Sequence, residues 1–309
     1  MKSLNIDKVP LLLDGGFGRE LRFRGIDILK SSWSASSLLS DPEVVRQIHI
    51  DYIEAGADLI TTNTYGIIRS DLAKDGMENR FEELNHIACQ LAIEARDKTD
   101  RKVLIAGALP PLSGSYRPDL VKDPSQIIPL YLEQAKLLAP YVDFFICETM
   151  SSASEAEAAA TAACQLEKPV WVAWTLHEHQ SACLRSGETV LQATNAISNL
   201  PVSGLLFNCC TPESITKAMP DLMNTKCKYI GGYANAFSPI PPDWKLDGDK
   251  ESDGFLDMRS DLDPDAYGIH ASDWLKAGAT VVGGCCGTRP AHIARIRQLI
   301  DERLKQDQI

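Results

Sequence analysis

Eight short apolar segments are spread along the whole chain, and they limit the possible folds more than any other feature. They lie at 11–16, 58–65, 103–109, 142–150, 170–176, 204–210, 228–235 and 280–286. Each is a nearly continuous hydrophobic run rather than an alternating one, as expected for parallel strands that are buried on both faces. We therefore predict eight parallel strands.

Helical patterns lie between these segments. A polar residue followed by proline, which is typical of a helix start, occurs at Asp41-Pro42, Asp123-Pro124, Thr211-Pro212 and Arg289-Pro290. The segment 152–165 is alanine-rich and favours a helix. Eight strands that alternate with helices predict an α/β fold, a single (β/α)₈ TIM barrel over residues 1–309. A doubly wound sheet is the alternative, but Gly16-Phe17-Gly18 lacks the third glycine of a dinucleotide-binding turn.

Charge and hydrophobicity restrict the class of partner. The 309 residues carry a net charge of -11 and no prominent cluster of lysine and arginine, so we expect no nucleic acid and no membrane surface as partner. The apolar run near the N-terminus is too short to span a bilayer and lacks a signal-peptide cleavage pattern. We expect a cytoplasmic protein that acts on small molecules, as a monomer or a small homo-oligomer.

Nine cysteines are an odd number for a disulfide framework, and several lie inside apolar runs. In a reducing compartment such cysteines are buried, catalytic or bound to a metal. We interpret Cys89, Cys164, Cys183 and Cys227 as packed or incidental thiols.

The carboxyl ends of barrel strands are where chemistry collects, and polar residues there need partners or a task. The strand ends of this chain carry a distinctive set: Asp14 with Gly15 and Gly16, Asn63, Glu148, Cys209, Asn235, and Cys285 with Cys286.

Three of these residues, Cys209, Cys285 and Cys286, suggest a metal site. The sixth and eighth strands lie two apart around the ring, so their ends can share one ligand. Adjacent cysteines on a strand face opposite ways, and we expect Gly283-Gly284 and Gly287 to let the chain leave β geometry. Three thiolates and one exchangeable position are typical of zinc, and a fourth thiol bound there would be deprotonated yet nucleophilic.

Other interpretations of these and neighbouring residues remain open. The cysteines could form a closed four-thiolate site that includes Cys210, a vicinal disulfide, or simply buried thiols. His177 and His179 could chelate a metal, although a pair of loop histidines is favoured. Asp247, Asp249 and Glu251 resemble a calcium loop, but the required glycine and acid are replaced by Ser252 and Met258, which favours a solvated loop within 236–263.

The sequence resembles the homocysteine S-methyltransferase family along essentially its whole length. The segment DPDAYGIHASDWLKAGATVVGGCCGTRPAHI is similar to the C-terminal signature of that family, and LLFNCC is similar to its Asn-Cys strand. LLLDGG, TTNTY and FFICET match the remaining blocks in order. The resemblance implies a zinc-dependent barrel, with Zn²⁺ as cofactor, that methylates the sulfur of L-homocysteine to give methionine.

By position, the resemblance assigns Cys209, Cys285 and Cys286 to zinc. It places the substrate carboxylate at the backbone of Gly15 and Gly16 after Asp14, and the substrate ammonium at Glu148. We add Asn63 and Asn235 as candidates for substrate binding, with hydrogen bonding to loops as the alternative. Many relatives carry Thr-Glu where this chain has Arg19-Glu20.

For the methyl donor, a single barrel of this length favours a small sulfonium such as S-methylmethionine, with S-adenosylmethionine second and betaine or dimethylsulfoniopropionate behind. Trp33, Tyr65 and Trp174 are candidates to contact a cationic donor, with core or rim packing as the alternative. Two other functions stay open. One is methylation of a different thiol or a selenol, such as selenocysteine, and the other is a non-enzymatic barrel stapled by zinc.

Overall fold

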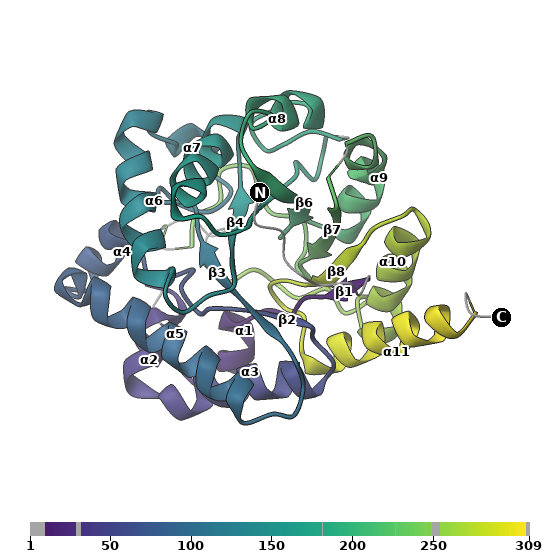
Figure 1. Cartoon of the computed structure of the whole chain (residues 1–309), viewed down its shortest axis with the longest axis horizontal. Coiled ribbons are helices and arrows are strands. Elements are labelled where there is room, and N and C mark those ends of the chain that lie inside the picture. The colour runs from purple at the N-terminus through teal and green to yellow at the C-terminus, as the bar shows by residue number, and fades with distance from the viewer. Residues whose placement is uncertain are drawn as a thin grey trace.

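The computed structural model describes residues 10–28, 32–180, 182–225, 227–246, 248 and 254–306. Within them, eight parallel strands form a ring that helices surround (Figure 1). The strands are β1 (Leu11–Leu12), β2 (Leu59–Thr61), β3 (Leu104–Leu109), β4 (Phe144–Met150), β5 (Val170–Trp174), β6 (Val202–Asn208), β7 (Tyr229–Ala234) and β8 (Val281–Gly284). The sheet order runs from β1 through β8 and back down to β2, and a bridge between Leu13 and Leu59 joins its two edges. The predicted TIM barrel is confirmed.

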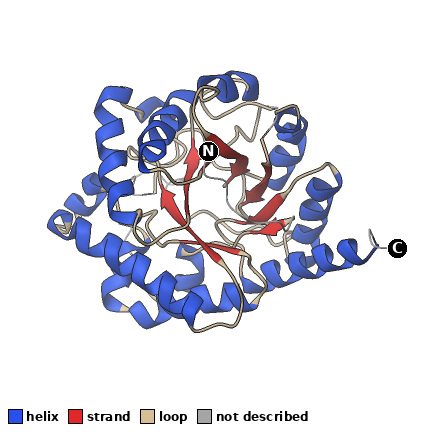
Figure 2. Cartoon of the chain, in the orientation of Figure 1, coloured by secondary structure: helices blue, strands red, loops and turns tan. Residues whose placement is uncertain are grey.

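Helices occupy the outside of the ring, as the blue ribbons of Figure 2 show. Those of the described residues are α1 (Gly18–Phe23), α2 (Ser37–Ser40), α3 (Pro42–Glu54), α4 (Arg69–Lys74), α5 (Phe81–Asp97), α6 (Pro124–Leu138), α7 (Ala153–Ala163), α8 (Val190–Ala196), α9 (Pro212–Met223), α10 (Pro264–Lys276) and α11 (Pro290–Gln306). Proline occupies the first position of α3, α6, α9 and α11, so all four predicted starts are confirmed. The alanine-rich helix is also confirmed as α7.

The inside of the barrel is filled by large side chains. Trp171 of β5 contacts Phe144 of β4 and Tyr229 of β7, with ring centroids 4.6 and 4.9 Å apart. All three rings are essentially inaccessible to solvent. The barrel is therefore a packed core and not a pore, which leaves its two ends as the places where a ligand can bind.

No helix in the described part of the chain combines the length and the apolar character needed to cross a bilayer. The long segment 236–263 connects β7 with α10. Several of its described residues, among them Trp244, Phe255 and Leu256, line the cavity at the carboxyl end of the barrel. Asp247, Asp249 and Glu251, which resemble a calcium loop, lie outside the described residues.

Candidate metal and substrate site

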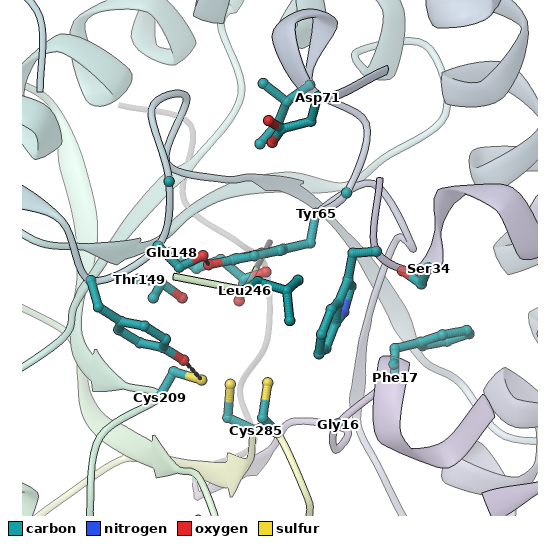
Figure 3. Close-up of a pocket in the computed structure, with 18 of the residues that line it drawn as sticks. Gly16, Phe17, Ser34, Tyr65, Asp71, Glu148, Thr149, Cys209, Leu246 and Cys285 are labelled. Carbon is teal, nitrogen blue, oxygen red and sulfur yellow. Dashed lines mark hydrogen bonds between the residues drawn. The ribbon is translucent and has the colours of Figure 1, made fainter. Parts of the chain in front are cut away.

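A cavity of about 840 Å³ opens at the carboxyl ends of the strands. It is lined by residues from most of the barrel, including Asp14, Gly15 and Gly16 after β1, Asn63 after β2, Glu148 of β4, Cys209 after β6, and Cys285 and Cys286 after β8. Figure 3 shows Glu148, Cys209 and Cys285 on the walls of one hollow. The structure thus brings together all the predicted site residues except Asn235.

The three cysteines of the predicted metal site form one cluster. The Sγ atoms of Cys209, Cys285 and Cys286 lie within 4.8 Å of one another. Thiolates about 2.3 Å from a tetrahedral zinc ion are about 3.8 Å apart, so a contraction of no more than about 1 Å would give zinc geometry. Soft sulfur donors are also the set that zinc prefers. Among the described residues, this is the one group of potential ligands with metal-binding geometry, and it fits zinc.

Cys209 takes an unusual backbone conformation at the end of β6. Its φ is 49°, in the left-handed region that residues with a side chain rarely adopt. Its amide donates to Tyr233 O at 3.1 Å, and its carbonyl accepts from Thr175 Oγ1 at 3.2 Å. Its sulfur lies 3.0 Å from the hydroxyl of Tyr116, the contact that the dashed line at Cys209 marks in Figure 3. These bonds turn Cys209 out of the strand and into the cavity.

Cys285 and Cys286 follow the last residue of β8. The amide of Cys285 donates to Ala234 O, and the carbonyl of Cys286 accepts from Ala236 N, both at 2.8 Å. Thr288 donates its amide and its hydroxyl to Cys285 O. The segment after β7 and the turn before α11 therefore fix the pair, and both are free thiols.

The glycines around this pair act differently from the prediction. Only Gly287 has a positive φ, of 84°, whereas Gly283 and Gly284 stay in β8. Instead, their missing side chains allow Leu13 and Thr288 to approach the backbone of β8 closely. A Cβ on Gly283 would lie 2.6 Å from the Cβ of Leu13, and one on Gly284 would lie 2.1 Å from Thr288 Oγ1. The expectation that Gly283-Gly284 supplies the change of direction was wrong, because the chain turns only after Gly284.

Cys210 does not join the cluster. Its side chain is fully buried and packs in the core between the strands and the outer helices, whereas Cys209 packs with Tyr116 at the cavity. Neighbouring residues at the end of β6 thus face opposite ways. The alternative of a closed site with four thiolates is not formed.

The three clustered thiols share their protons unequally. Burial raises the pKa of Cys209, but hydrogen bonds from Cys285, Cys286 and Tyr116 outweigh it and bring that pKa well below its ordinary value. The hydrogen bonds with Cys209 also hold the pKa of Cys285 and of Cys286 well above the ordinary value of a thiol. The surroundings therefore favour one thiolate, on Cys209.

Glu148 belongs to β4, all of whose residues are buried. Tyr233 donates its hydroxyl to Glu148 Oε2 at 3.1 Å. Burial raises the pKa of Glu148 to about 8, and the negative charges of Cys209 and Asp14 add to this effect. A cation in the cavity would favour the ionised carboxylate, so this position suits the ammonium group of an amino acid.

Asp14 and the two glycines after it connect β1 to its neighbours. Thr61 donates its amide to Asp14 Oδ2 at 2.8 Å, and burial raises the pKa of Asp14 to about 7. The amide of Gly16 donates to the carbonyl and to the hydroxyl of Thr288, at 3.3 Å each. A Cβ on Gly16 would lie 2.5 Å from Cys285 O. The glycines thus allow the turn after β1 to pack on the turn that carries the cysteines, and their predicted contact with a substrate carboxylate stays a prediction.

The two asparagines have different surroundings. Asn63 lines the cavity, where it accepts a hydrogen bond from the hydroxyl of Ser34 and donates to the carbonyl of the same residue. Asn235 is fully buried, is not among the lining residues, and accepts a hydrogen bond from Phe237 N at 3.2 Å. Its position therefore supports the alternative, that it orders the segment after β7.

The histidine pair is not arranged for chelation. The rings of His177 and His179 are 6.1 Å apart and nearly perpendicular. His177 Nδ1 accepts hydrogen bonds from the amides of His179 and Gln180, both at 3.1 Å, so its lone pair is already used. Neither histidine belongs to a group with metal-binding geometry among the described residues.

Two of the three aromatic candidates for contact with a cationic donor lie at the cavity, and the third does not. Trp33 and Tyr65 line the cavity, whereas Trp174 of β5 is fully buried and does not. Trp33, Tyr116, Thr149 and Cys209 all line the cavity and all have a positive φ. Backbone strain in residues with a side chain tends to collect at functional sites.

Sequence reasoning missed two tyrosines. Tyr233, which binds Glu148, lies inside an apolar strand, where a buried hydroxyl signals a polar partner. Tyr116 lies in the segment between β3 and α6, far from any strand end, and no local pattern connects it with Cys209. Only the folded chain brings Tyr116 and Cys209 together.

Comparison with known proteins identifies relatives of this arrangement. The family model described as homocysteine S-methyltransferase matches residues 11–300. Homocysteine S-methyltransferase YbgG of Bacillus subtilis is 25% identical over 94% of this chain and 95% of its own length. Homocysteine S-methyltransferase 3 of Zea mays is 28% identical over 97% of this chain and 92% of its own length. The crystal structure of the metallated form of the homocysteine methyltransferase MmuM from Escherichia coli is similar, with a TM-score of 0.78 and 26% identity, over 94% of this chain and 96% of that one.

Proposed function

The chain belongs to the homocysteine S-methyltransferase family, and from this premise we propose that it is a zinc-dependent enzyme that methylates L-homocysteine with a small sulfonium donor. We assign the zinc ligands to Cys209, Cys285 and Cys286. The observation that carries the proposal is the convergence of these three thiols, from the ends of two different strands, on one wall of a cavity of about 840 Å³.

When bound, zinc would lower the pKa of the homocysteine thiol, so that the sulfur is a thiolate at neutral pH and remains nucleophilic. The remaining parts of the reaction fall to the chain itself. Glu148 binds the ammonium group of homocysteine, and the turn at Gly15 and Gly16 lies beside its carboxylate. With both charged groups on its α-carbon held, the other end of the amino acid, which carries the sulfur, faces the cysteine cluster.

The methyl transfer is a displacement at carbon. The homocysteine sulfur forms a bond to the methyl carbon while the bond between that carbon and the donor sulfur breaks. The bonding pair goes to the donor sulfur, which becomes a neutral thioether, and the thiol proton of homocysteine has already left to solvent. Because the nucleophile and the donor meet inside one cavity, much of the rate enhancement would come from alignment.

We rank S-methylmethionine first as donor, then S-adenosylmethionine, with betaine or dimethylsulfoniopropionate behind. Trp33 and Tyr65 support a cationic donor, because both line the cavity and an aromatic face attracts a positive charge. We also propose that residues 1–309 act as one homocysteine-binding domain, in the cytoplasm, as a monomer or small homo-oligomer.

A panel of methyl donors tests the function. Zinc-loaded protein is mixed with homocysteine and each donor, carrying a deuterated methyl group, and labelled methionine is measured by mass spectrometry. We expect labelled methionine with at least one sulfonium donor. No labelled methionine with any donor would refute the proposal.

Cysteine variants test the ligand assignment. Cys286→Ser is compared with Cys164→Ser, a half-buried cysteine remote from the cluster. We expect Cys286→Ser to lose both zinc and activity and Cys164→Ser to keep both. Full zinc content and full activity in Cys286→Ser would show that the assignment is wrong. Zinc binding without methionine formation would instead favour a barrel that zinc only staples.

A further inference from the structure

Tyr116 contacts the proposed metal ligand Cys209 from a different part of the chain. Its hydroxyl lies 3.0 Å from Cys209 Sγ, and both residues are buried, at 4% and 2% exposure. A sulfur bound to a metal has lost its proton, so within this contact the tyrosine must be the donor. A hydrogen bond to a thiolate is charge-assisted, which makes it stronger than a bond between neutral groups.

The ring of Tyr116 is itself held in place. The guanidinium carbon of Arg185 lies 4.6 Å from the ring centroid on one side, and Trp244 packs at 5.5 Å. Tyr116 has a φ of 64°, in the left-handed region, so its own backbone is strained. Such a conformation persists only where the surroundings fix it.

Arg185 is half of a buried ion pair. Its guanidinium donates to Glu178 Oε2 at 3.1 Å, and the two side chains are only 5% and 1% exposed. Glu178 also accepts from the amides of Thr211 and Ile240. This pair therefore ties the loop after β5 to the residues that follow Cys209 and to the segment after β7.

A second line of contacts leads from Arg185 to Cys209. Arg185 Nε donates to Thr175 Oγ1 at 3.3 Å, and Thr175 Oγ1 donates to Cys209 O at 3.2 Å. Arg185 thus contacts both Tyr116, which reaches the sulfur of Cys209, and Thr175, which reaches its carbonyl. Since Cys209 has a strained φ of 49°, it depends on such support.

We propose that Tyr116 is a positioning residue that donates a hydrogen bond to the Cys209 thiolate, and that the buried Glu178–Arg185 pair holds both residues in place for metal binding. This inference rests on the proposed zinc function. By accepting the hydrogen bond, the Cys209 sulfur donates less charge to the ion, and its orientation toward Cys285 and Cys286 is fixed. Partners of this kind, one step removed from a metal, are worth roughly 10- to 100-fold in affinity.

The first test measures zinc affinity by competition with a chelator, without substrate. Tyr116→Phe removes only the hydroxyl, and Tyr131→Phe is the control, because Tyr131 is a fully buried tyrosine whose hydroxyl faces Met150. We expect Tyr116→Phe to weaken zinc binding roughly 10- to 100-fold and Tyr131→Phe to leave it unchanged. With cobalt(II) in place of zinc, the thiolate-to-metal absorption band should shift in Tyr116→Phe alone. Wild-type zinc affinity together with an unshifted band in Tyr116→Phe would overturn the role of the hydroxyl. X-ray absorption at the zinc edge gives a second check. An oxygen ligand that is present in the wild type and lost in Tyr116→Phe would show that the hydroxyl binds the metal itself, which would also overturn the proposal.

The second test addresses Arg185. Arg185→Met leaves Glu178 buried without its partner, so it can fail to fold, and Arg185→Lys is the informative variant. Lysine keeps the charge that Glu178 needs but lacks the planar group that packs on the Tyr116 ring. We expect Arg185→Lys to fold and to bind zinc more weakly than wild type, with a cobalt band shifted in the same direction as in Tyr116→Phe. Wild-type zinc affinity in Arg185→Lys would refute the positioning role of the pair.

The outcomes separate this inference from the proposed function. A wild-type protein that binds zinc but makes no methionine refutes only the catalytic proposal, since affinity and cobalt spectra are measured without substrate. A wild-type protein that binds no zinc refutes both. Full catalysis in the wild type with unchanged zinc binding in Tyr116→Phe refutes only the inference.

Discussion

Gly16→Ala would move two proposed zinc ligands without changing any ligand. Gly16 has no positive φ, so its backbone accepts alanine, and only the space around it is restrictive. The new Cβ would lie 2.5 Å from Cys285 O and 2.9 Å from both Cys286 Cα and Gly287 N. These are backbone atoms, which cannot rotate away. To reach ordinary contact at 3.4 Å, the turn with the two cysteines must move by about 0.9 Å.

Such a movement is several times larger than the tolerance of about 0.2 Å in metal–ligand distances. We therefore expect zinc affinity to fall at least tenfold, as it does when supporting partners are lost, on the order of 10- to 100-fold. Overpacking should also lower the free energy of unfolding by about 1–3 kcal/mol.

The assay is chelator competition for zinc, with urea unfolding of the metal-free protein beside it. The control is Gly268→Ala in α10, where the new Cβ meets the end of the Leu299 side chain at 3.0 Å and helix propensity improves by about 1 kcal/mol. Equal zinc affinity and equal stability in the two variants would refute the reasoning that the contact at Gly16 sets the position of the cysteines.

Three further predictions follow from single side chains. Glu148→Gln should raise KM for homocysteine about 10- to 100-fold with little change in zinc affinity, because a charge-assisted contact is worth about 1.5–3 kcal/mol; steady-state kinetics with an unchanged KM would contradict this. Burial raises the pKa of Glu155 from 4.5 to about 7. The folded chain therefore holds this proton more tightly than the unfolded chain, and the resulting contribution to the free energy of unfolding is complete below pH 4.5 and lost as the pH rises through 7. In urea unfolding, the free energy of unfolding of Glu155→Gln should therefore exceed that of the wild type by about 3 kcal/mol at pH 8 and equal it at pH 4.5. A variant that is less stable than the wild type by the same amount at both pH values would contradict this prediction. His177→Ala should keep a full equivalent of zinc by elemental analysis, because His177 Nδ1 accepts backbone amides, and loss of that equivalent would implicate the histidine as a ligand.

All eight strands were predicted from the sequence, but several of them end earlier than expected. The second apolar segment was predicted as 58–65, whereas β2 spans only Leu59–Thr61. Beyond it, Thr62 Oγ1 accepts from Ala108 N, and Thr64 Oγ1 donates to Ala108 O. Threonine side chains take over the hydrogen bonds of the strand ladder, so the backbone is free to bend around the cavity. A hydrophobic pattern does not reveal this substitution, because threonine is also a common strand residue.

The candidate site was also predicted in part. The cysteine cluster could be predicted because the number of strands fixes which ends are close, and thiols at the ends of the sixth and eighth strands must then face one cavity. The contribution of Gly283-Gly284 could not be predicted correctly. A glycine pair in sequence looks the same whether it allows a turn or allows a neighbour such as Leu13 to approach.

The sequence by itself determined the barrel and the cysteines at the ends of its sixth and eighth strands, because the spacing of the apolar runs and the residue types at their ends can be read locally. Tertiary structure alone decided how Cys209, and not Cys210, turns into the cavity, since its left-handed φ depends on bonds with Thr175, which follows β5, and with Tyr233 of β7. It also decided the contact of Tyr116 with the cluster. That contact joins residues 93 positions apart through side chains of no distinctive pattern, and a sequence carries no local sign of such a meeting.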